Sequence, residues 1–357
     1  MRRYRIAAIG GDGVGPEVIE GGLSVLSDLA GREGFTLDVT RFDWGSDYYR
    51  RTGRMMAADG VEQLKSFDAI YFGAVGDPDI PDHITLWDLR LAICQGLDQY
   101  ANVRPTKLIG GMRGPLRCEL GDQIDWVIVR ENSEGEYAGV GGRAHAGLPI
   151  ELAMDVAVFT RAGVERICRF ACETAIARPR KRLTVVTKSN AQRHGMVLWD
   201  EACRDVLKDF PELDVDWKLV DAMAALMVTK PGDFDTILAS NLHADILSDL
   251  ASALTGSLGN GATDNVDPSG KHPSMYEPIH GSAFEIMGKG IANPIGAFWT
   301  GALMLEHLDE AAAAEKLMSA IESVSRSGPH TPDLGGQADT RAVTQAILDA
   351  IRRGNRY

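Results

Sequence analysis

Short apolar runs rich in β-branched residues alternate with amphipathic helical stretches along most of this chain. The strand-like runs are YRIAAI, TLDVTRF, FDAIYFGAV, IDWVIVR, RLTVVT, DVDWKLV and FDTILAS. The helical patterns cover residues 16–30, 84–100, 160–177, 192–209, 241–254, 293–307, 311–326 and 338–352. Because hydrophobic periods of two and of 3.6 residues follow one another repeatedly, the sequence predicts an α/β architecture.

Length and charge limit the classes of partner. At 357 residues the chain exceeds one typical core, so we expect two lobes or one large α/β domain. The formal net charge of −13 argues against nucleic acids and membrane surfaces as partners, and an anionic substrate must be attracted by local arginines. No stretch approaches transmembrane length. Five cysteines without a C-x-x-C pattern are interpreted as thiols, which predicts a cytoplasmic location.

The segment IAAIGGDGVGPEVIE, residues 6–20, has the outline of a dinucleotide-binding turn, because an apolar strand leads through glycines into a helix. Its spacing is G-x-G-x-G, formed by Gly11, Gly13 and Gly15, and Pro16 stands where the third glycine of the Rossmann fingerprint would lie. The next strand-like stretch, FTLDVTRFDWG, contains aspartates, so an acidic residue able to bind a ribose hydroxyl is present at the position that a dinucleotide site requires. We favour a strand-to-helix turn that needs permissive backbone.

Three aspartates have the pattern of a metal site. In SNLHADILSDL, Asp245 and Asp249 are four residues apart on a predicted helix, so their Cβ atoms lie about 5–6 Å apart on one face. Asp221 follows the run DVDWKLV, at the carboxyl end of a strand where α/β folds bind ligands. Carboxylates without a histidine or cysteine pattern suit Mg²⁺ or Mn²⁺ better than zinc. The alternative is a solvated acidic helix face.

Arginines and two proton-transfer candidates form a second group. Arg104 precedes a proline in YANVRPTK, Arg130 ends an apolar strand, and Arg90 lies on the preceding helix. Converging guanidinium groups bind a carboxylate bidentately and fix its orientation. Tyr137 can exchange a proton near Arg130, and Lys188 ends the strand-like stretch RLTVVTK. A lysine beside a metal can have a lowered pKa and act as a base. Taken singly, each of these residues is better explained as structural.

A third segment, YEPIHGSAFEIMGKGIANP, has the composition of a binding loop. It contains loop glycines, His280, the acidic Glu285, and Asn293 before a proline. An acid that meets a ribose 2′-hydroxyl prefers NAD to NADP, because a 2′-phosphate would be repelled.

Seven segments in order over nearly the whole chain resemble one family of enzymes. They are GDGVGPE, YANVRP, VRENSEGEYAG, TKSN, SNLHADILSDL, EPIHGSAFEIMGKGIANP and TPDLGG. Together they resemble the β-decarboxylating dehydrogenases, the isocitrate and 3-isopropylmalate dehydrogenase family. Within it, FDWGSDYYRRTGRMM, FGAVGDPDIPDHITLWDLR and DQYANVRPTK are most similar to the tartrate and D-malate dehydrogenase branch.

The resemblance implies a two-lobed α/β fold with a large mixed sheet shared by the lobes, which is not a Rossmann fold. The larger, cofactor-side domain would comprise residues 1–100 and 255–357. Residues 101–254 would form the substrate, metal and dimerisation domain, with an arm near 138–158 that clasps a second subunit. The family forms homodimers in which Lys188 and Asp221 reach into the partner's site.

The resemblance also implies roles for individual residues. Lys188 resembles the general base and Tyr137 the general acid, while Arg104 and Arg130 match the carboxylate clamp. The metal ligands would be Asp221, Asp245 and Asp249. The implied cofactors are NAD and Mg²⁺ or Mn²⁺, with a monovalent cation as a further candidate. The residues that match the NAD loop are His280, Gly281, Ser282, Ala283, Glu285 and Asn293.

Two positions depart from the family pattern. Gly10 replaces a proline before the GDG turn, and Cys94 replaces an arginine ten residues before Arg104. Arg90 lies one turn earlier, where isopropylmalate enzymes place an apolar residue against the substrate's branched group. A buried arginine there suits a carboxylate or hydroxyl better than an isopropyl group. The alternative is that Arg90 points to solvent or pairs with Asp88.

The expected activity is therefore NAD- and metal-dependent oxidation of a (2R)-hydroxy four-carbon diacid, D-malate or a tartrate, with or without decarboxylation. One alternative within the class is a 3-isopropylmalate or isocitrate dehydrogenase. An alternative from another class is a metal-dependent decarboxylase without net redox chemistry, which would not need Glu285 or Asn293. A non-catalytic metal-binding protein would leave Lys188, Tyr137 and the arginines without a purpose.

Overall fold

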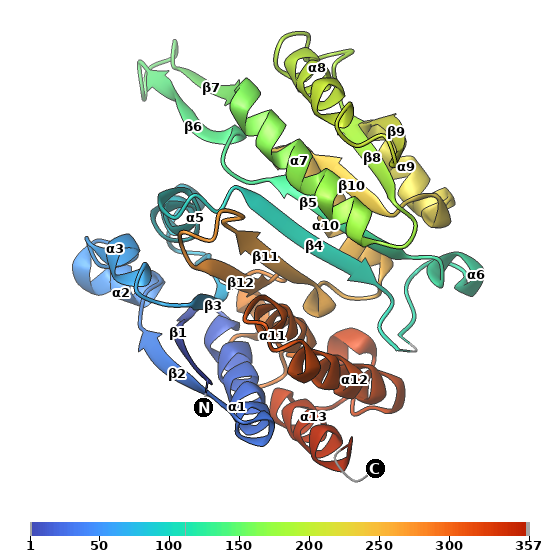
Figure 1. The fold of residues 1–357 in the computed structure, drawn as a ribbon. Helices are drawn as coiled ribbons and strands as arrows, with labels where there is room; N and C mark the ends of the chain where they lie inside the picture. The colour runs from blue at the N-terminus through green and yellow to red at the C-terminus, as the bar shows by residue number, and fades with distance from the viewer. Residues whose placement is uncertain (1, 111, 355–357) are drawn as a thin grey trace.

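The computed structural model describes residues 2–110 and 112–354. Within them, ten strands form one sheet in the order β2-β1-β3-β12-β11-β4-β5-β10-β8-β9, and β6 pairs separately with β7 (Figure 1). The strands of the large sheet are β1 (Arg2–Gly11), β2 (Phe35–Phe42), β3 (Ala69–Ala74), β4 (Ala101–Lys107), β5 (Asp125–Glu131), β8 (Arg182–Thr187), β9 (Asp214–Leu219), β10 (Thr236–Ala239), β11 (Ala262–Val266) and β12 (Ser274–Pro278). The separate pair is β6 (Gly135–Ala144) and β7 (Leu152–Val158).

The sheet consists of two parallel groups that run in opposite directions. Strands β2, β1, β3 and β12 pair in parallel, and so do β5, β10, β8 and β9. Between these groups, β11 is antiparallel to both β12 and β4, and β4 is antiparallel to β5. The fold is therefore α/β with one mixed sheet, as predicted, and it lacks the doubly wound parallel order of a Rossmann domain.

Helices cover both faces of each parallel group, as Figure 1 shows. The longer helices are α1 (Gly15–Glu33), α7 (Arg161–Ala177), α8 (Gly195–Leu207), α9 (Val220–Thr229), α10 (Asn241–Leu254), α11 (Ile295–His307), α12 (Ala311–Ser327) and α13 (Thr340–Gly354). The shorter ones are α2 (Ser46–Thr52), α3 (Gly60–Leu64), α4 (Asp82–Thr85), the π-helix η1 (Leu86–Leu91), α5 (Ala92–Gly96) and α6 (Cys118–Gly121), with 3₁₀ turns η2 (Pro231–Asp233), η3 (Leu258–Asn260), η4 (Phe284–Ile286) and η5 (Pro332–Leu334).

Burial on both faces explains why β3 and residues 6–9 of β1 are continuously apolar. In β1, Ile6 and Ala8 pack towards α1 and α11, whereas Ala7 and Ile9 pack towards α5. Strands buried on both faces have no polar side to alternate with. Two hydrophobic clusters come mainly from residues before 100 and after 261, and two from 101–254. The division into domains at these boundaries stays a prediction.

The helix expected over residues 84–100 is shorter and irregular. It comprises α4, the π-helix η1 and α5, and it ends at Gly96, four residues earlier than predicted. Asp98, which has a positive φ of 47°, then turns the chain towards β4. A π-turn holds one extra residue, so it changes the direction in which the side chains after it point. Arg90 lies within this segment.

The glycine-rich turn after β1 uses its amides within the protein. Asp12 donates to the carbonyl oxygen of Ala74 and Val14 to that of Ser282, both at 2.8 Å, and Gly15 donates to Asp12 at 2.9 Å. A phosphate-binding turn needs such N–H groups free to face the ligand. The turn therefore connects β1 to the end of β3 and to the loop around Ser282, in agreement with the prediction that it is not a dinucleotide fingerprint.

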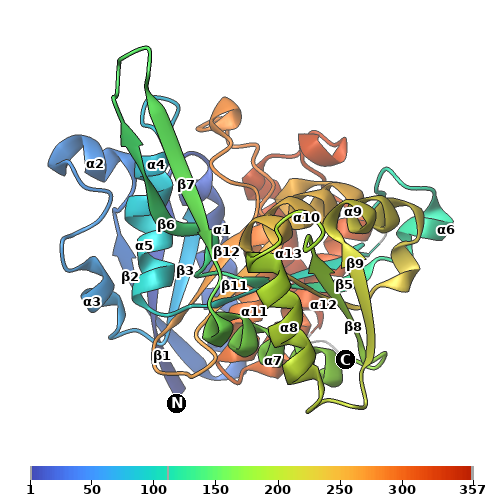
Figure 2. The ribbon, with the colours of Figure 1, turned by 90° about the horizontal axis from the view of Figure 1, so that it is seen from above.

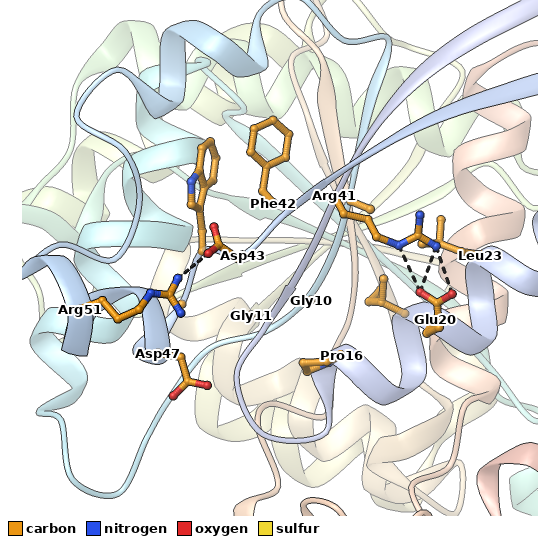
Figure 3. Close-up of a pocket in the computed structure, with 14 residues that line it drawn as sticks. Gly10, Gly11, Pro16, Glu20, Leu23, Arg41, Phe42, Asp43, Asp47 and Arg51 are labelled. Carbon is orange, nitrogen blue, oxygen red and sulfur yellow. Dashed lines mark hydrogen bonds and ion pairs between the residues drawn. The ribbon is translucent and has the colours of Figure 1, made fainter.

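A pocket of about 290 Å³ does lie beside this turn, at the carboxyl ends of β1 and β2 (Figure 3). Its two arginines are already paired with carboxylates: Arg41 with Glu20 at 3.1 Å, and Arg51 with Asp43. Pro16 contributes no N–H donor. Both arginines that line this pocket among the described residues are thus already paired, and three amides of the turn are bonded within the protein, which disfavours pyrophosphate binding here.

The pair β6 and β7 extends beyond the rest of the molecule, as Figure 2 shows. Several large apolar side chains on it are exposed, namely Val140, Leu148, Ile150, Leu152, Met154 and Val156. An exposed apolar surface of this kind is typical of an interface between proteins. The arm expected near residues 138–158 is thus present as a hairpin, and its contact with a second subunit stays a prediction. None of the helices in the described parts of the chain has the length and apolar character that crossing a membrane requires.

The turn provides a test of backbone crowding. Gly11 has a φ of +69°, and a Cβ atom there would overlap the carbonyl oxygen of Ala74. Gly34 has a φ of +77° with no atom near an added Cβ. We expect Gly34→Ala to lower the free energy of unfolding by about 1 kcal/mol, through backbone strain alone. Gly11→Ala should lower it by about 3 kcal/mol, because the backbone at Ala74 must also shift to make room for the new Cβ atom. Denaturant unfolding measures both variants, and equal losses would contradict the crowding argument.

Candidate active site

Polar side chains from the central strands share one face of the sheet. Directly opposed residues of antiparallel strands point to the same side. Asn265 of β11 is opposite Asn102 of β4, and Asn102 is opposite Arg130 of β5. Alternation along each strand adds Arg104 and Glu277 to this face. The register therefore gathers residues from four strands into one polar row between η1 and α10.

Arg90 lies at one end of this row, and it is buried. Its Nε donates to Glu277 Oε1 at 2.8 Å, its Nη2 lies 2.6 Å from the same oxygen, and Nη2 also donates to Asn265 Oδ1 at 3.2 Å. Arg90 therefore points inward and pairs with Glu277. The alternative, a solvent-exposed arginine paired with Asp88, is wrong.

Arg104 and Arg130 are held by the face of α10 that packs on β4 and β5. Asn241, Asp245 and Ser248 follow one another at helical spacing on that face. Arg130 donates to Asn241 Oδ1 through Nε at 2.9 Å and Nη2 at 2.7 Å, and through Nη1 to Asp245. Arg104 donates to Ser248, and its Nη2 lies 3.7 Å from Asp245 Oδ1.

A chain of amides joins these arginines to Arg90. Arg104 Nε donates to Asn102 Oδ1 at 2.9 Å, and Asn102 Nδ2 donates to Asn265 Oδ1 at 2.7 Å. Asn265 also accepts from Asn132 Nδ2 at 3.1 Å. Two asparagines thus bridge Arg90 and Arg104, and Asp245 links Arg104 to Arg130.

The charges of this group shift the pKa values of its members. Burial opposes the charge on Asp245, but Arg130, Arg104 and Arg90 outweigh it and hold the pKa of Asp245 below its usual value. Burial and the neighbouring charge of Arg130 lower the pKa of Arg104 to about 10. The site therefore holds Arg104 and Arg130 against the half-buried carboxylate of Asp245, while Arg90 is paired with Glu277.

Tyr137 joins the same group from β6. Its hydroxyl donates to Asp245 Oδ2 at 3.2 Å, and the Arg130 guanidinium carbon lies 5.3 Å from its ring centroid. Burial, followed by the carboxylate of Asp245, raises the pKa of Tyr137. The phenol therefore keeps its proton at neutral pH, as a general acid must.

Lys188 and Asp221 lie together but apart from the aspartates of α10. Lys188 Nζ donates to Asp221 Oδ1 at 2.7 Å, and this bond lowers the pKa of Asp221. Among the residues that the structure describes, no three histidine, cysteine or acidic side chains are close enough to hold one metal ion. A single chain thus does not bring Asp221 to Asp245 and Asp249.

The two aspartates of α10 still have the chemistry that a hard cation requires. Asp249 is exposed and makes no hydrogen bond or ion pair within the described chain. Its pKa is raised by partial loss of hydration and then by the neighbouring Asp245. A carboxylate destabilised by a like charge gains most from a bound cation. Asp245 and Asp249 therefore fit Mg²⁺ or Mn²⁺ as oxygen ligands, although one chain supplies only two of them.

The loop after β12, which is predicted to bind the cofactor, borders a separate cavity of about 370 Å³. Its lining is mainly apolar and includes Val14, Leu258, Ala283, Ile286, Ile291 and Ala292, with His280, Asn293 and Asp333 as polar members. A flat apolar heterocycle with a few polar edges suits such a cavity.

His280 provides an unused acceptor at this cavity. Its Nδ1 lies 2.7 Å from the carbonyl oxygen of Gly281, which can only accept, so Nδ1 carries the proton. Nε2 is buried without a partner in the described chain, and burial lowers the pKa of His280. The neutral ring therefore offers Nε2 to a donor such as an adenine amino group.

The other residues expected in this loop occupy different environments. Asn293 donates to Asn260 and Asp333 at 2.9 and 2.8 Å and accepts from the amide that begins α11, so its side chain is already engaged. Glu285 is exposed on η4, next to Ile286 of the cavity wall. Ser282 accepts from Val14, and Gly281 and Ala283 have positive φ angles.

Sequence reasoning missed the residues that hold the predicted ones in place. These are Asn102, Asn241, Ser248, Asn265 and Glu277. Asn241 and Ser248 could have been found, because they lie four residues before and three after Asp245 on the same predicted helix. Asn265 and Glu277 left no such signal, because their strands lack apolar alternation.

The two α10 aspartates form a matched pair for a stability test without metal. We expect Asp245→Asn to lower the free energy of unfolding by about 2 kcal/mol, because buried arginines lose their counter-charge. Asp249→Asn should change it by less than about 0.5 kcal/mol. The fold lowers the pKa of Asp245 below its ordinary value of 3.8. The stabilisation that the ionised carboxylate provides is therefore complete above pH 3.8 and is lost as the pH falls through the lower pKa of the folded state. Denaturant unfolding at pH 7 and pH 3 measures the free energy of unfolding of both variants. Equal losses at pH 7 would contradict the role of Asp245 as the counter-charge.

Comparison with known proteins shows which family the chain matches. The model of the isocitrate/isopropylmalate dehydrogenase family matches residues 5–351. A probable tartrate dehydrogenase/decarboxylase TtuC of Agrobacterium vitis is 64% identical over 357 residues, which are 99% of this chain and 98% of the relative. The decarboxylating D-malate dehydrogenase of Escherichia coli (strain K12) is 47% identical over 360 residues, 99% of this chain and 100% of the relative. An isocitrate dehydrogenase structure from Methylococcus capsulatus has a TM-score of 0.88 at 32% identity and covers 98% of this chain and 99% of its own. The chain therefore belongs to the isocitrate/isopropylmalate dehydrogenase family.

Proposed function

We propose that this oxidoreductase oxidises a (2R)-hydroxy four-carbon diacid, a tartrate or D-malate, with NAD⁺ and Mg²⁺ or Mn²⁺, and that decarboxylation can follow. The observation that carries the proposal is the pair of buried arginines, Arg104 and Arg130, beside Asp245. Arg90 is already paired with Glu277, so Arg104 and Arg130 against the one half-buried carboxylate of Asp245 leave positive charge for a substrate carboxylate. The names of the two relatives above agree with this substrate class.

Arg104 and Arg130 would hold a substrate carboxylate. Both are buried, and their forks are oriented by Asn102 and Asn241 before any ligand arrives. An oriented fork loses little entropy on binding and fixes the carboxylate plane. The substrate would compete with Asp245 for these donors, which would release Asp245 to act as a metal ligand.

Asp245 and Asp249 of one subunit, with Asp221 of the other, would hold the divalent ion, and the cavity beside His280 would hold the adenine of NAD⁺. When bound, the ion polarises the C2 oxygen and NAD⁺ accepts the hydride. Glu285 on the exposed turn η4 would favour NAD⁺, because a 2′-phosphate would be repelled by its carboxylate.

The proton transfers would belong to Lys188 and Tyr137. Lys188 would remove the C2 hydroxyl proton as the hydride leaves, and the product is a β-keto acid that can lose CO₂. Tyr137, whose raised pKa keeps it protonated, would then donate its proton to the carbon. Lys188 and Asp221 form an ion pair away from Asp245, which favours a homodimer in which they act in the partner's site.

The test compares substrates in one NAD⁺ reduction assay with Mn²⁺. We expect kcat/KM for a tartrate stereoisomer or D-malate to exceed that for 3-isopropylmalate and isocitrate at least about tenfold. NADP⁺ should be used at least about tenfold less efficiently, and removal of the metal should abolish the reaction. Preference for 3-isopropylmalate or isocitrate would refute the substrate class. Release of CO₂ without NAD⁺ reduction would instead indicate a metal-dependent decarboxylase.

The shared site makes a separate prediction. Lys188→Met and Tyr137→Phe should each lower kcat by about 10²–10⁴. A mixed dimer has one site in which Tyr137 and Lys188 are both intact, so co-expression of the two variants should restore roughly a quarter of the wild-type activity. Tagged subunits show whether mixed dimers form. If they form without recovery, both residues act within one subunit.

A further inference from the structure

Tyr137 lies in a bulge of β6, outside the regular ladder that this strand forms with β7. The strand β6 advances from Gly135 to Val140 while β7 advances only from Val158 to Val156. A bulge leaves backbone groups of the longer strand without partners in the ladder, and it changes the direction in which the side chains point. Pairing within the hairpin therefore does not by itself fix the position of Tyr137.

The helical segment that precedes β4 holds the backbone of this bulge. Gln95 of α5 donates through Nε2 to the carbonyl oxygen of Tyr137 at 3.2 Å. Further along β6, Gly139 has a φ of +71°, and a Cβ atom there would lie 2.9 Å from the ring of Trp87 in η1. The backbone on both sides of Ala138 is thus in contact with η1 and α5.

Other elements hold the side chain of the same residue. The Tyr137 hydroxyl donates to Asp245 of α10 at 3.2 Å, and the guanidinium carbon of Arg130 in β5 lies 5.3 Å from the ring centroid. These two partners belong to residues 101–254, whereas Gln95 and Trp87 precede residue 100. Tyr137 is therefore held from both of the domains that the sequence predicts, by its backbone from one and by its phenol from the other.

We propose that Gln95 is a positioning residue for the general acid Tyr137. Its bond to the carbonyl oxygen keeps the bulge in the conformation that directs the phenol towards the reacting carbon. Gln95 is exposed and lies outside the polar row around Asp245, so it acts on the reaction through Tyr137. A small displacement of a catalytic group is enough to slow a reaction severely. This inference rests on the proposed function.

The step that depends on this position is the proton transfer to carbon. After CO₂ leaves, the O–H bond of Tyr137 breaks, its proton and an electron pair of the enolate form the new C–H bond, and the tyrosinate regains a proton from water. In the reverse direction, a methyl C–H bond of bound pyruvate breaks, its proton passes to the tyrosinate, and a deuteron from D₂O takes its place. Hydride transfer precedes this step and does not use the phenol.

The test is the rate at which the full-length enzyme, with Mg²⁺ and NADH, exchanges the methyl hydrogens of pyruvate with D₂O, measured by NMR. Gln95→Met and Gln95→Glu both keep the length of the side chain and remove its donor. Each should slow the exchange by about three- to tenfold, while the KM values for the diacid and for NAD⁺ stay within about twofold. Gln123→Met removes a bond of the same kind, from Nε2 to the carbonyl oxygen of Glu119 at 2.6 Å, and should leave the exchange unchanged.

A double variant separates positioning from a general loss of structure. Tyr137→Phe removes the phenolic proton, so a residue that acts only through this proton has nothing left to position. Adding Gln95→Met to Tyr137→Phe should therefore change the residual decarboxylating turnover by less than about 1.5-fold. A merely structural role for Gln95 predicts instead the same fold loss in both backgrounds.

The outcomes separate the two proposals. Unchanged exchange in both Gln95 variants, or equal fold losses with and without the phenol, overturns the positioning role while the proposed function stands. A loss carried by the KM for NAD⁺ would assign Gln95 to the cofactor and also overturn it. A wild-type enzyme that reduces NAD⁺ with a four-carbon diacid but exchanges no pyruvate hydrogen has no carbon protonation for Gln95 to assist, which overturns the inference as well. If no four-carbon diacid reduces NAD⁺ in the wild type, the proposed function itself fails.

Discussion

Burial of three arginines on one face of a sheet is the constraint on which the centre of this structure depends. A buried guanidinium group is tolerated only when a carboxylate and further acceptors surround it. Glu277 meets this need for Arg90, and Asp245 with Asn241 meets it for Arg130. Because such partners must come from neighbouring strands and from α10, the central strands carry polar residues where a core would otherwise be apolar.

The need to surround buried arginines with polar partners also explains why the site lies where antiparallel strands interrupt the parallel groups of the sheet. A parallel strand covered on both faces is continuously apolar, as β3 and residues 6–9 of β1 are. The antiparallel pairings of β11 with β12, of β11 with β4 and of β4 with β5 interrupt that pattern and place polar residues opposite one another. The two parallel groups thus supply the hydrophobic cores, and the antiparallel centre supplies the chemistry.

The binding loop and the glycine turn form a second coupled unit. Val14 donates to Ser282 across the cavity edge, and Asp12 holds the amides of Ser46 at 2.6 Å and Gly76 at 3.0 Å. The glycines of the turn are needed because the backbone passes so close to Ala74 and Ser282 that side chains would overlap them. The resemblance to a dinucleotide fingerprint arises from this close packing, because both structures need glycine where the backbone approaches another group.

The sequence alone determined the α/β class, the helix that carries Asp245 and Asp249, and the clustering of the arginines. Each of these depends on local periodicity or on motifs that one segment contains. It did not reveal β4, β11 or β12, because a proline in β4 and β12 and polar residues in β11 hide the strand pattern. Only the tertiary structure decided that Arg90 pairs with Glu277, 187 residues away, and that Lys188 with Asp221 lies apart from α10. Such partners are chosen by strand register and by a π-turn, and neither leaves a periodic trace in one sequence.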